Sequence, residues 1–153
     1  MKQWQRFPTF KQRGEWVELQ FMAQAALHGY HVLKPWGDSL TYDAGIETVG
    51  RLVRVQVKSS SFQRGTGYYC EFKPRNYRKG YSLKQVDLFA AYVIPTNAWY
   101  LIPAAALLRY AIQGLMLCPV KPPQRCPYTY EKYREAWGLL GKDRRELARR
   151  GRC

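Results

Sequence analysis

The chain has 153 residues, the size of one domain, and 46% of them are hydrophobic, enough to build a core. With 24% charged residues, this composition excludes a disordered or a fibrous protein. Lysine and arginine number 25 against 11 aspartates and glutamates, which gives a net charge of +14. A small protein that basic is expected to bind a polyanion, and nucleic acid is the first candidate.

The charge is unevenly distributed along the chain. Residues 14–50 contain five of the eleven acidic residues and a single base, Lys34. Residues 51–84 contain nine bases and a single acid, Glu71. We interpret this pattern as a small acidic site within a surface that attracts phosphate.

Cysteine spacing argues against a zinc-binding protein, and hydropathy argues against a secreted or a membrane-spanning one. The four cysteines form no CxxC pair, so we expect free thiols in a reducing cytosol and no zinc site. The first residues lack the apolar segment of a signal peptide. Residues 88–108 carry no charge over a membrane-spanning length, but Pro95 and Pro103 interrupt them. We therefore predict a strand, a turn, a strand and the start of a helix there, and no membrane segment.

The first half of the chain contains one predicted helix and three predicted strands, at residues 14–27, 31–34, 41–47 and 52–58. In the helix, Trp16, Ala23 and Leu27 are spaced as on one apolar face, and Gly29 ends it. Val49-Gly50 marks a turn between the second and third strands.

The second half is expected to add further strands and two helices. The predicted strands are residues 68–72 and 99–102, and residues 86–94 begin as a helix or form a strand. The predicted helices are residues 104–112, opened by Pro103, and residues 130–140; a basic loop (73–80), a proline-rich linker (119–127) and a basic tail complete the chain. The order of elements predicts an α/β or mixed α+β fold, with helices flanking a mixed sheet.

Polar residues interrupt the apolar pattern at places where core packing does not require them. Glu18 lies in the first predicted helix, and Asp43 lies in the second predicted strand. Gln56 and Lys58 lie two residues apart in the third strand, so their side chains face the same side of the sheet. A hairpin between these two strands brings Asp43 close to the Gln56–Lys58 pair.

This set of side chains has the chemistry of a metal-dependent phosphodiesterase. A carboxylate, an amide oxygen and backbone carbonyls are hard oxygen ligands, which suit Mg²⁺. A lysine beside the metal can orient an attacking water, while the ion stabilises charge on the phosphate. The residues therefore predict hydrolysis of a phosphodiester bond.

Two of these residues also have a plain structural interpretation within the first helix and the second strand. Glu18 can be a solvated helix residue, and Glu15, on a similar face, competes for its role. Glu15 is expected in the first turn, where it would stabilise the helix dipole. Aspartate is disfavoured in strands, so Asp43 calls for a functional reason.

The third strand and two other acids leave similar alternatives. Lys58 can be an edge-strand charge, and Gln56 can be a polar residue that faces water. Asp38 and Asp87 are typical of turns and helix caps, and we place both outside the site. The position of Lys58 two residues after Gln56, in a strand otherwise rich in valine, favours the functional interpretation.

In this order, the residues resemble the signature of the PD-(D/E)XK nucleases. Glu18, Asp43 and Gln56-Val57-Lys58 are similar to a variant in which glutamine replaces the acid before X-Lys. A wider set of runs resembles the branch of group I intron-associated homing endonucleases and their bacterial relatives. These runs are Gly29-Tyr-His-Val, Pro35-Trp-Gly-Asp, Tyr42-Asp43, Arg54-Val-Gln-Val-Lys58, Asp87 and Tyr100-Leu-Ile-Pro103. The resemblance covers about residues 11–110.

The resemblance implies a restriction-endonuclease-like fold, with a central mixed sheet flanked by helices, and an Mg²⁺-dependent endodeoxyribonuclease that can also use Mn²⁺. By position, Asp43 would be the main metal ligand, Gln56 would supply a second oxygen and Glu18 would support the metal. Lys58 would be the catalytic lysine. The chain departs from the common signature in two ways: Tyr42 stands where a proline precedes the aspartate, and Gln56 is neutral, which is expected to weaken metal binding.

A basic segment follows the candidate site and is interleaved with Tyr77 and Tyr81. Such a segment can hold a DNA backbone, although a charge run is also typical of a solvated loop. The residues predicted to bind DNA are Arg64, Lys73, Arg75, Arg78 and Lys79.

The sequence thus predicts an endonuclease that hydrolyses duplex DNA and works as a homodimer or homotetramer, in the cytoplasm and at the nucleoid when bound. Residues 1–116 are expected to form the nuclease domain, and residues 117–153 a linker, a short helix and a basic tail. The alternatives are a nuclease like the Holliday-junction resolvases, a DNA-binding module with a decayed site, and a basic domain that associates with RNA.

Overall fold

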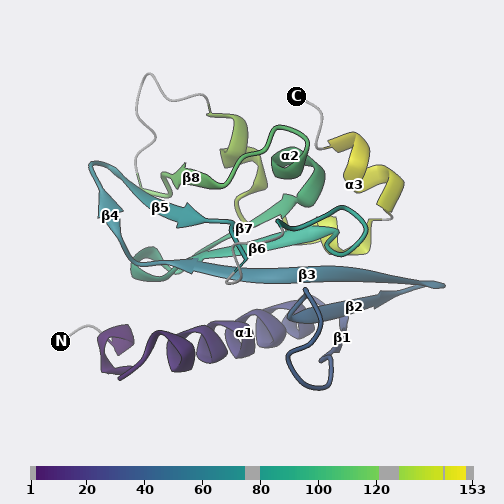
Figure 1. Cartoon of the computed structure of the whole chain (residues 1–153), viewed down its shortest axis with the longest axis horizontal. Coiled ribbons are helices and arrows are strands. Elements are labelled where there is room, and N and C mark those ends of the chain that lie inside the picture. The colour runs from purple at the N-terminus through teal and green to yellow at the C-terminus, as the bar shows by residue number, and fades with distance from the viewer. Residues whose placement is uncertain (1–2, 75–79, 121–127, 143, 151–153) are drawn as a thin grey trace.

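The computed structural model describes residues 3–74, 80–120, 128–142 and 144–150. A central sheet carries one long helix, α1 (Phe10–Leu27), on one face. A small second sheet and the shorter helices α2 (Ala104–Leu108) and α3 (Arg144–Arg150) lie on the other side (Figure 1). This is the mixed sheet with flanking helices that the sequence predicts.

The central sheet has five strands in the order β1-β2-β3-β6-β7. They are β1 (His31–Leu33), β2 (Ala44–Thr48), β3 (Arg51–Ser60), β6 (Leu88–Val93) and β7 (Ala98–Pro103). Every neighbouring pair is antiparallel except β3 and β6, which run parallel. The uncharged stretch 88–108 is thus a strand, a turn, a strand and a helix start, as predicted. No helix in the described part of the chain is long and apolar enough to cross a membrane.

Helix α1 packs on the sheet through Val17, Phe21 and Ala25. Residues spaced by four lie on one side of a helix, so these three form a continuous stripe. The predicted apolar face was wrong, because Ala23 and Leu27 are exposed and Trp16 is only partly buried. Apolar residues occur on all sides of this helix, so their spacing alone did not identify the side that meets the sheet.

The start of α1 also differs from the prediction. Thr9 caps the helix, since its hydroxyl accepts a hydrogen bond of 3.1 Å from the Gln12 amide. The helix therefore begins at Phe10, four residues before the predicted Gly14. Glu15 consequently lies beyond the first turn, and it is exposed. Gly29, at a φ of +84°, follows the end of the helix as predicted.

The second sheet covers the face of the central sheet opposite α1. It consists of β4 (Gln63–Arg64), β5 (Gly67–Glu71) and β8 (Gly114–Leu117), in the order β4-β5-β8. The Ser60 hydroxyl of β3 donates to the Tyr69 carbonyl of β5 at 2.5 Å, which joins the two sheets. The parallel connection from β3 to β6 contains β4 and β5 of this second sheet.

The C-terminal segment packs against β7, an edge strand of the central sheet. It consists of 3-10 helices η3 (Tyr128–Tyr133) and η4 (Trp137–Gly141) rather than the α-helix predicted over 130–140. The Glu135 backbone amide donates a hydrogen bond of 2.8 Å to the Trp99 carbonyl, and the Glu135 carboxylate accepts one of 2.7 Å from the Trp99 amide. The segment thereby satisfies backbone groups that an open edge would leave unpaired.

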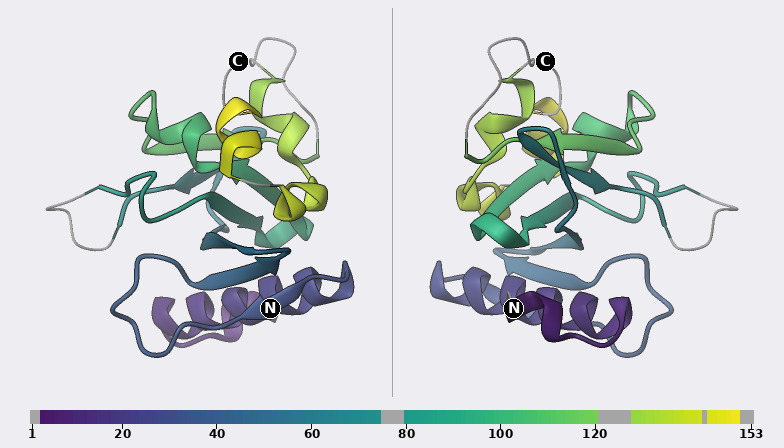
Figure 2. Two further views of the ribbon diagram at one scale, coloured as in Figure 1. Left: turned by 90° about the vertical axis from the view of Figure 1, so that its right-hand side faces the viewer. Right: turned by 90° about the vertical axis from the view of Figure 1, so that its left-hand side faces the viewer.

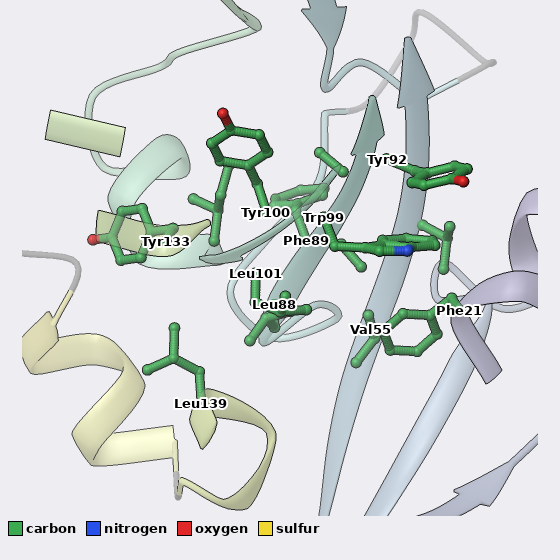
Figure 3. Close-up of a cluster of buried hydrophobic side chains, with 14 of the residues drawn as sticks. Phe21, Val55, Leu88, Phe89, Tyr92, Trp99, Tyr100, Leu101, Tyr133 and Leu139 are labelled. Carbon is green, nitrogen blue, oxygen red and sulfur yellow. The ribbon is translucent and has the colours of Figure 1, made fainter. Parts of the chain in front are cut away.

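Aromatic side chains join α1, the sheet and the C-terminal segment into one core (Figure 3). Trp99 stacks on Tyr92 at 4.4 Å between ring centroids and lies 5.8 Å from Phe21. Trp137 of η4 lies 5.9 Å from Trp99 and 6.0 Å from Phe21. Large aromatic surfaces of this kind dominate the energy of a core.

Candidate functional site

The site is organised around Asp43, the residue that precedes β2. Its Oδ2 atom accepts a hydrogen bond of 2.8 Å from the Val57 backbone amide. The same oxygen accepts one of 2.5 Å from Nε2 of Gln56. The Asp43 amide in turn donates to the Val55 carbonyl at 2.9 Å. Asp43 is therefore held against β3 both by its carboxylate and by its backbone amide.

The β2–β3 hairpin explains why these residues meet. Its register pairs Ala44 with Val55, and its two-residue turn contains Gly50 at a φ of +71°. Extending this register by one residue places Asp43 opposite Gln56. The predicted hairpin and its turn are confirmed, although Asp43 lies just before the strand rather than inside it.

Lys58 lies two residues beyond Gln56 on β3, and its side chain is half-buried. Its ammonium donates to the Lys73 carbonyl at 3.0 Å and lies 5.1 Å from the centroid of the Tyr81 ring. Lys58 therefore contacts the chain on both sides of residues 75–79. The electrostatic field of the Lys58 ammonium also reaches Asp43, whose pKa it lowers.

Glu18 reaches the site from α1, through Lys34. The ammonium of Lys34 lies 2.5 Å from Oε2 of Glu18 and donates to the Asp43 backbone carbonyl at 3.1 Å. Glu18 is close enough for its charge to raise the pKa of Asp43. Of the two glutamates that compete on sequence grounds, Glu18 lies beside Asp43, whereas Glu15 is exposed.

Burial dominates the electrostatics of Asp43. Burial raises the pKa of Asp43 from its ordinary value of 3.8 to about 6, and the negative charge of Glu18 adds to this effect. The hydrogen bond from Val57 and the charges of Lys58 and Lys34 oppose the rise without cancelling it. A cation bound beside Asp43 would relieve the unfavourable burial of the carboxylate.

The donor set fits a hard divalent cation. Two carboxylates, those of Asp43 and Glu18, and the amide of Gln56 come together on α1, β3 and the residue before β2. Oxygen donors of this type suit Mg²⁺ or Mn²⁺, which keep several water ligands. In the described ranges, no three His, Cys, Asp or Glu side chains form a metal-binding group. An ion held by these side chains would keep coordination positions for water.

Two of the five residues predicted to bind DNA, Arg64 and Lys73, lie in the described part of the chain. Arg64 is exposed on β4, where its guanidinium lies 5.6 Å from the centroid of the Tyr69 ring. Lys73 is half-buried, and its carbonyl is the one that Lys58 contacts. Arg75, Arg78 and Lys79 lie outside the described residues, so their predicted role stays a prediction.

Sequence reasoning missed two side chains that shape the site. Lys34 contacts both Glu18 and Asp43, and its signal was its position as the single base in residues 14–50. Asp87 is buried rather than a surface turn residue. It accepts three hydrogen bonds of 2.9 Å from Arg54, and this pair joins the start of β6 to β3. No sequence signal linked these two residues.

Comparison with known proteins agrees with the geometry. The sequence model of the PD-(D/E)XK endonuclease family matches residues 9–137. Among solved structures, the chain is similar to that of a bacterial homing endonuclease, I-Ssp6803I, with a TM-score of 0.75 and 30% sequence identity. This similarity covers 87% of the chain and 93% of I-Ssp6803I. Among curated proteins, no significant match is found. The chain therefore belongs to the PD-(D/E)XK endonuclease family, as its Glu18, Asp43 and Gln56-x-Lys58 pattern predicts, and it is a DNA endonuclease.

Proposed function

We propose that this endonuclease cleaves duplex DNA as homing endonucleases do, by Mg²⁺-dependent hydrolysis at the site around Asp43. The observation that carries the proposal is the contact of Asp43 with both Gln56 and the Val57 amide, with Lys58 one residue further along β3. This contact brings the acid and the amide of the family signature together at one end of a hairpin, and the lysine follows on the same strand.

In this proposal, Asp43, Gln56 and Glu18 hold the metal ion. When bound, the ion supplies positive charge that stabilises the phosphate in the transition state and lowers the pKa of a bound water. Gln56 presents Nε2 to Asp43 in the described arrangement, and half a turn of its amide presents Oε1 in the same place. The neutral amide contributes less charge than a carboxylate, so weaker metal binding is expected.

Lys58 is proposed as the catalytic lysine. Its ammonium can hold the attacking water by a hydrogen bond and stabilise negative charge as the water loses its proton. The contacts of Lys58 with Lys73 and Tyr81 orient the side chain from the second-sheet side of β3. We propose that the backbone of DNA lies across Arg64, Lys73, Arg75, Arg78 and Lys79.

The wider setting follows from the same proposal. One site cuts one strand, so cleavage of a duplex favours a homodimer or a homotetramer. We place the protein in the cytoplasm, at the nucleoid when it is bound to DNA. Residues 1–116 are proposed as the nuclease domain, with residues 117–153 appended to it. Tyr133, Trp137 and Leu140 of the appended part share the core of the sheet.

The test is cleavage of supercoiled plasmid and of mixed genomic DNA in Mg²⁺, in Mn²⁺ and in EDTA. We expect nicking or linearisation in both metals, none in EDTA, and none by Asp43→Ala in any condition. Asp38→Ala is a matched control, because Asp38 is an exposed acid in the loop that precedes Asp43 and is not one of the proposed metal ligands. Cleavage that persists in Asp43→Ala would place the active site elsewhere.

One observation favours a second candidate, a DNA-binding module whose nuclease site has decayed. Gln56 stands where the common signature has an acid, and it replaces one of the charges that hold the metal. DNA binding that survives EDTA, with no cleavage in either metal on genomic DNA, would establish this candidate. Preferential cleavage of four-way junctions over linear duplex would instead indicate an enzyme like the junction resolvases.

A further inference from the structure

Lys34 occupies a position in the site that no catalytic role requires. Its ammonium lies 2.5 Å from the Glu18 carboxylate and 3.1 Å from the Asp43 carbonyl oxygen. Both contacts are made to oxygens that belong to residues around the proposed metal. A positive charge therefore already lies on the Glu18 carboxylate, one of the groups to which the metal ion is proposed to bind.

The surroundings of Lys34 allow this contact to be exchanged. The Lys34 side chain is 48% exposed and that of Glu18 is 26% exposed. Ion pairs at this degree of exposure contribute little to stability, because water solvates both groups nearly as well when they separate. Lys34 follows the last residue of β1, so its long side chain can swing into solvent without disturbing the sheet.

Because the site is negatively charged, exchange of Lys34 for a metal ion affects how tightly the ion binds. Glu18 and Asp43 repel each other, and without a cation between them the site holds two negative charges close together. Lys58 and Lys34 both oppose the negative charge at Asp43, and Lys34 is the one whose ammonium lies 2.5 Å from the Glu18 carboxylate. Any divalent ion that takes Glu18 as a ligand must first displace the Lys34 ammonium or accept its repulsion.

We propose that Lys34 is a resident counterion of the metal site: its ammonium and a divalent cation compete for the Glu18 carboxylate. Lys34 then neutralises Glu18 while no metal is bound, and it lowers the affinity for metal in the absence of DNA. This inference rests on the proposed function, because it takes Asp43 and Glu18 as metal ligands.

The competition can be measured as Mn²⁺ affinity of the full chain without DNA, by electron paramagnetic resonance of the free ion. Lys34→Met removes the charge and keeps the length of the side chain, whereas Lys34→Arg keeps the charge and is the matched control. We expect Lys34→Met to bind Mn²⁺ about tenfold more tightly than the wild type, from loss of one nearby like charge. Lys34→Arg should stay within about threefold of the wild type.

A double-mutant cycle with Glu18→Gln tests whether the competition acts through Glu18. In the Glu18→Gln background, Lys34→Met should change Mn²⁺ affinity by less than about twofold, because the shared carboxylate is gone. An equal gain in both backgrounds would overturn the proposal and indicate long-range repulsion alone. A gain below about twofold in the wild-type background would also overturn it.

Two further measurements separate this inference from the proposed function. Asp43→Asn should abolish Mn²⁺ binding in every background; if it does so while Lys34→Met has no effect, the metal site stands and only the role of Lys34 fails. Absence of Mn²⁺ binding in the wild type and in Lys34→Met alike would overturn both. Thermal melting in EDTA confirms that each variant is folded, and Lys34→Gln replaces Lys34→Met if the latter does not fold.

Discussion

At the scale of single residues, Asp43 shows how a functional group is held at a cost to stability. Burial raises the pKa of its carboxyl to about 6, so the unfolded chain holds the ionised form more easily than the folded chain. As pH rises from about 4 to above 6, the folded state therefore loses stability relative to the unfolded state. Above pH 6 the whole penalty is present.

Asp43→Asn should therefore stabilise the protein at neutral pH when metal is removed. The amide oxygen of asparagine can still accept from Val57, while the buried charge disappears. We expect the free energy of unfolding at pH 8 in EDTA to rise by about 1–2 kcal/mol, which is a gain of about 3–6 °C in melting temperature. The difference should vanish near pH 4, and thermal melts across this pH range check it. A lower melting temperature for the variant at pH 8 would contradict this account.

Lys58 gives a second prediction at this scale. Lys58→Ala should lower the cleavage rate at saturating protein by at least about 100-fold, because the water loses the ammonium that positions it. Melting temperature and DNA affinity are expected to change little, because Lys58 is half-buried and its ammonium donates to a backbone carbonyl, that of Lys73.

The control for Lys58→Ala is Lys84→Ala, which removes an exposed lysine from the same basic part of the chain. Lys84→Ala should weaken DNA binding slightly and leave the rate of the bound complex unchanged. Unfolding of Lys58→Ala, together with loss of DNA binding, would show that Lys58 is structural.

At the scale of elements, the loop 34–43 joins β1 to β2 and ends at the site. Figure 2 shows this loop projecting to the same side of the molecule as the chain around residues 73–74 and 80–82. Trp36 on this loop is 97% exposed and Leu40 is 51% exposed. A fully exposed indole on the loop that leads to Asp43 is suited to stacking on a base or to inserting at a base step.

Trp36→Ala should therefore weaken DNA binding by about fivefold or more, which corresponds to the loss of one stacked base. Melting temperature and Mn²⁺ affinity should not change, because Trp36 makes almost no contact with the rest of the protein. Val49→Ala is the matched control, since Val49 is an equally exposed apolar residue at the other end of β2. Fluorescence anisotropy with labelled duplex measures both variants, and equal affinities would remove Trp36 from the interface.

Prediction at the scale of elements succeeded where the pattern was local. The hairpin turn at Val49-Gly50 and the strand that carries Gln56 follow from alternation and from a single glycine, which neighbouring residues determine. The face of α1 did not follow, because its apolar residues surround the helix and only the sheet selects Val17, Phe21 and Ala25. The choice of Glu18 over Glu15 depends on the same selection.

At the scale of the whole molecule, the C-terminal segment completes the core of the nuclease fold. Trp137 is buried, lies against Phe21 and Trp99, and stacks on His28 at 4.6 Å. Its indole N–H donates to Glu135 at 2.8 Å, and the same carboxylate accepts from the Trp99 amide.

A nearby surface pocket of about 370 Å³, lined by Tyr133, Leu139 and Lys142 among others, shares no residue with the site around Asp43.

Trp137→Ala should lower the free energy of unfolding by about 3–5 kcal/mol, the usual effect of removing a large buried aromatic side chain. Leu19→Ala on the exposed side of α1 is the control and should change it by less than about 0.5 kcal/mol. Urea unfolding followed by tryptophan fluorescence and circular dichroism measures both. A chain of residues 1–116 that is as stable as the full protein would contradict this role and would support an independent nuclease domain.

The sequence by itself determined that Asp43 meets Gln56, two residues from Lys58, because these residues lie at one hairpin whose register is set by local spacing. It also determined the order of strand, turn, strand and helix start over residues 88–108, since prolines and the loss of charge mark the boundaries, but it left open whether residues 86–94 begin as a helix. The tertiary structure alone decided which glutamate of α1 faces the site, that Lys34 lies between Glu18 and Asp43, and that Asp87 holds Arg54. It also decided that the last segment forms 3-10 helices along β7. Each of these features depends on a partner far away in the sequence, and the spacing of hydrophobic residues does not show which distant residues come into contact.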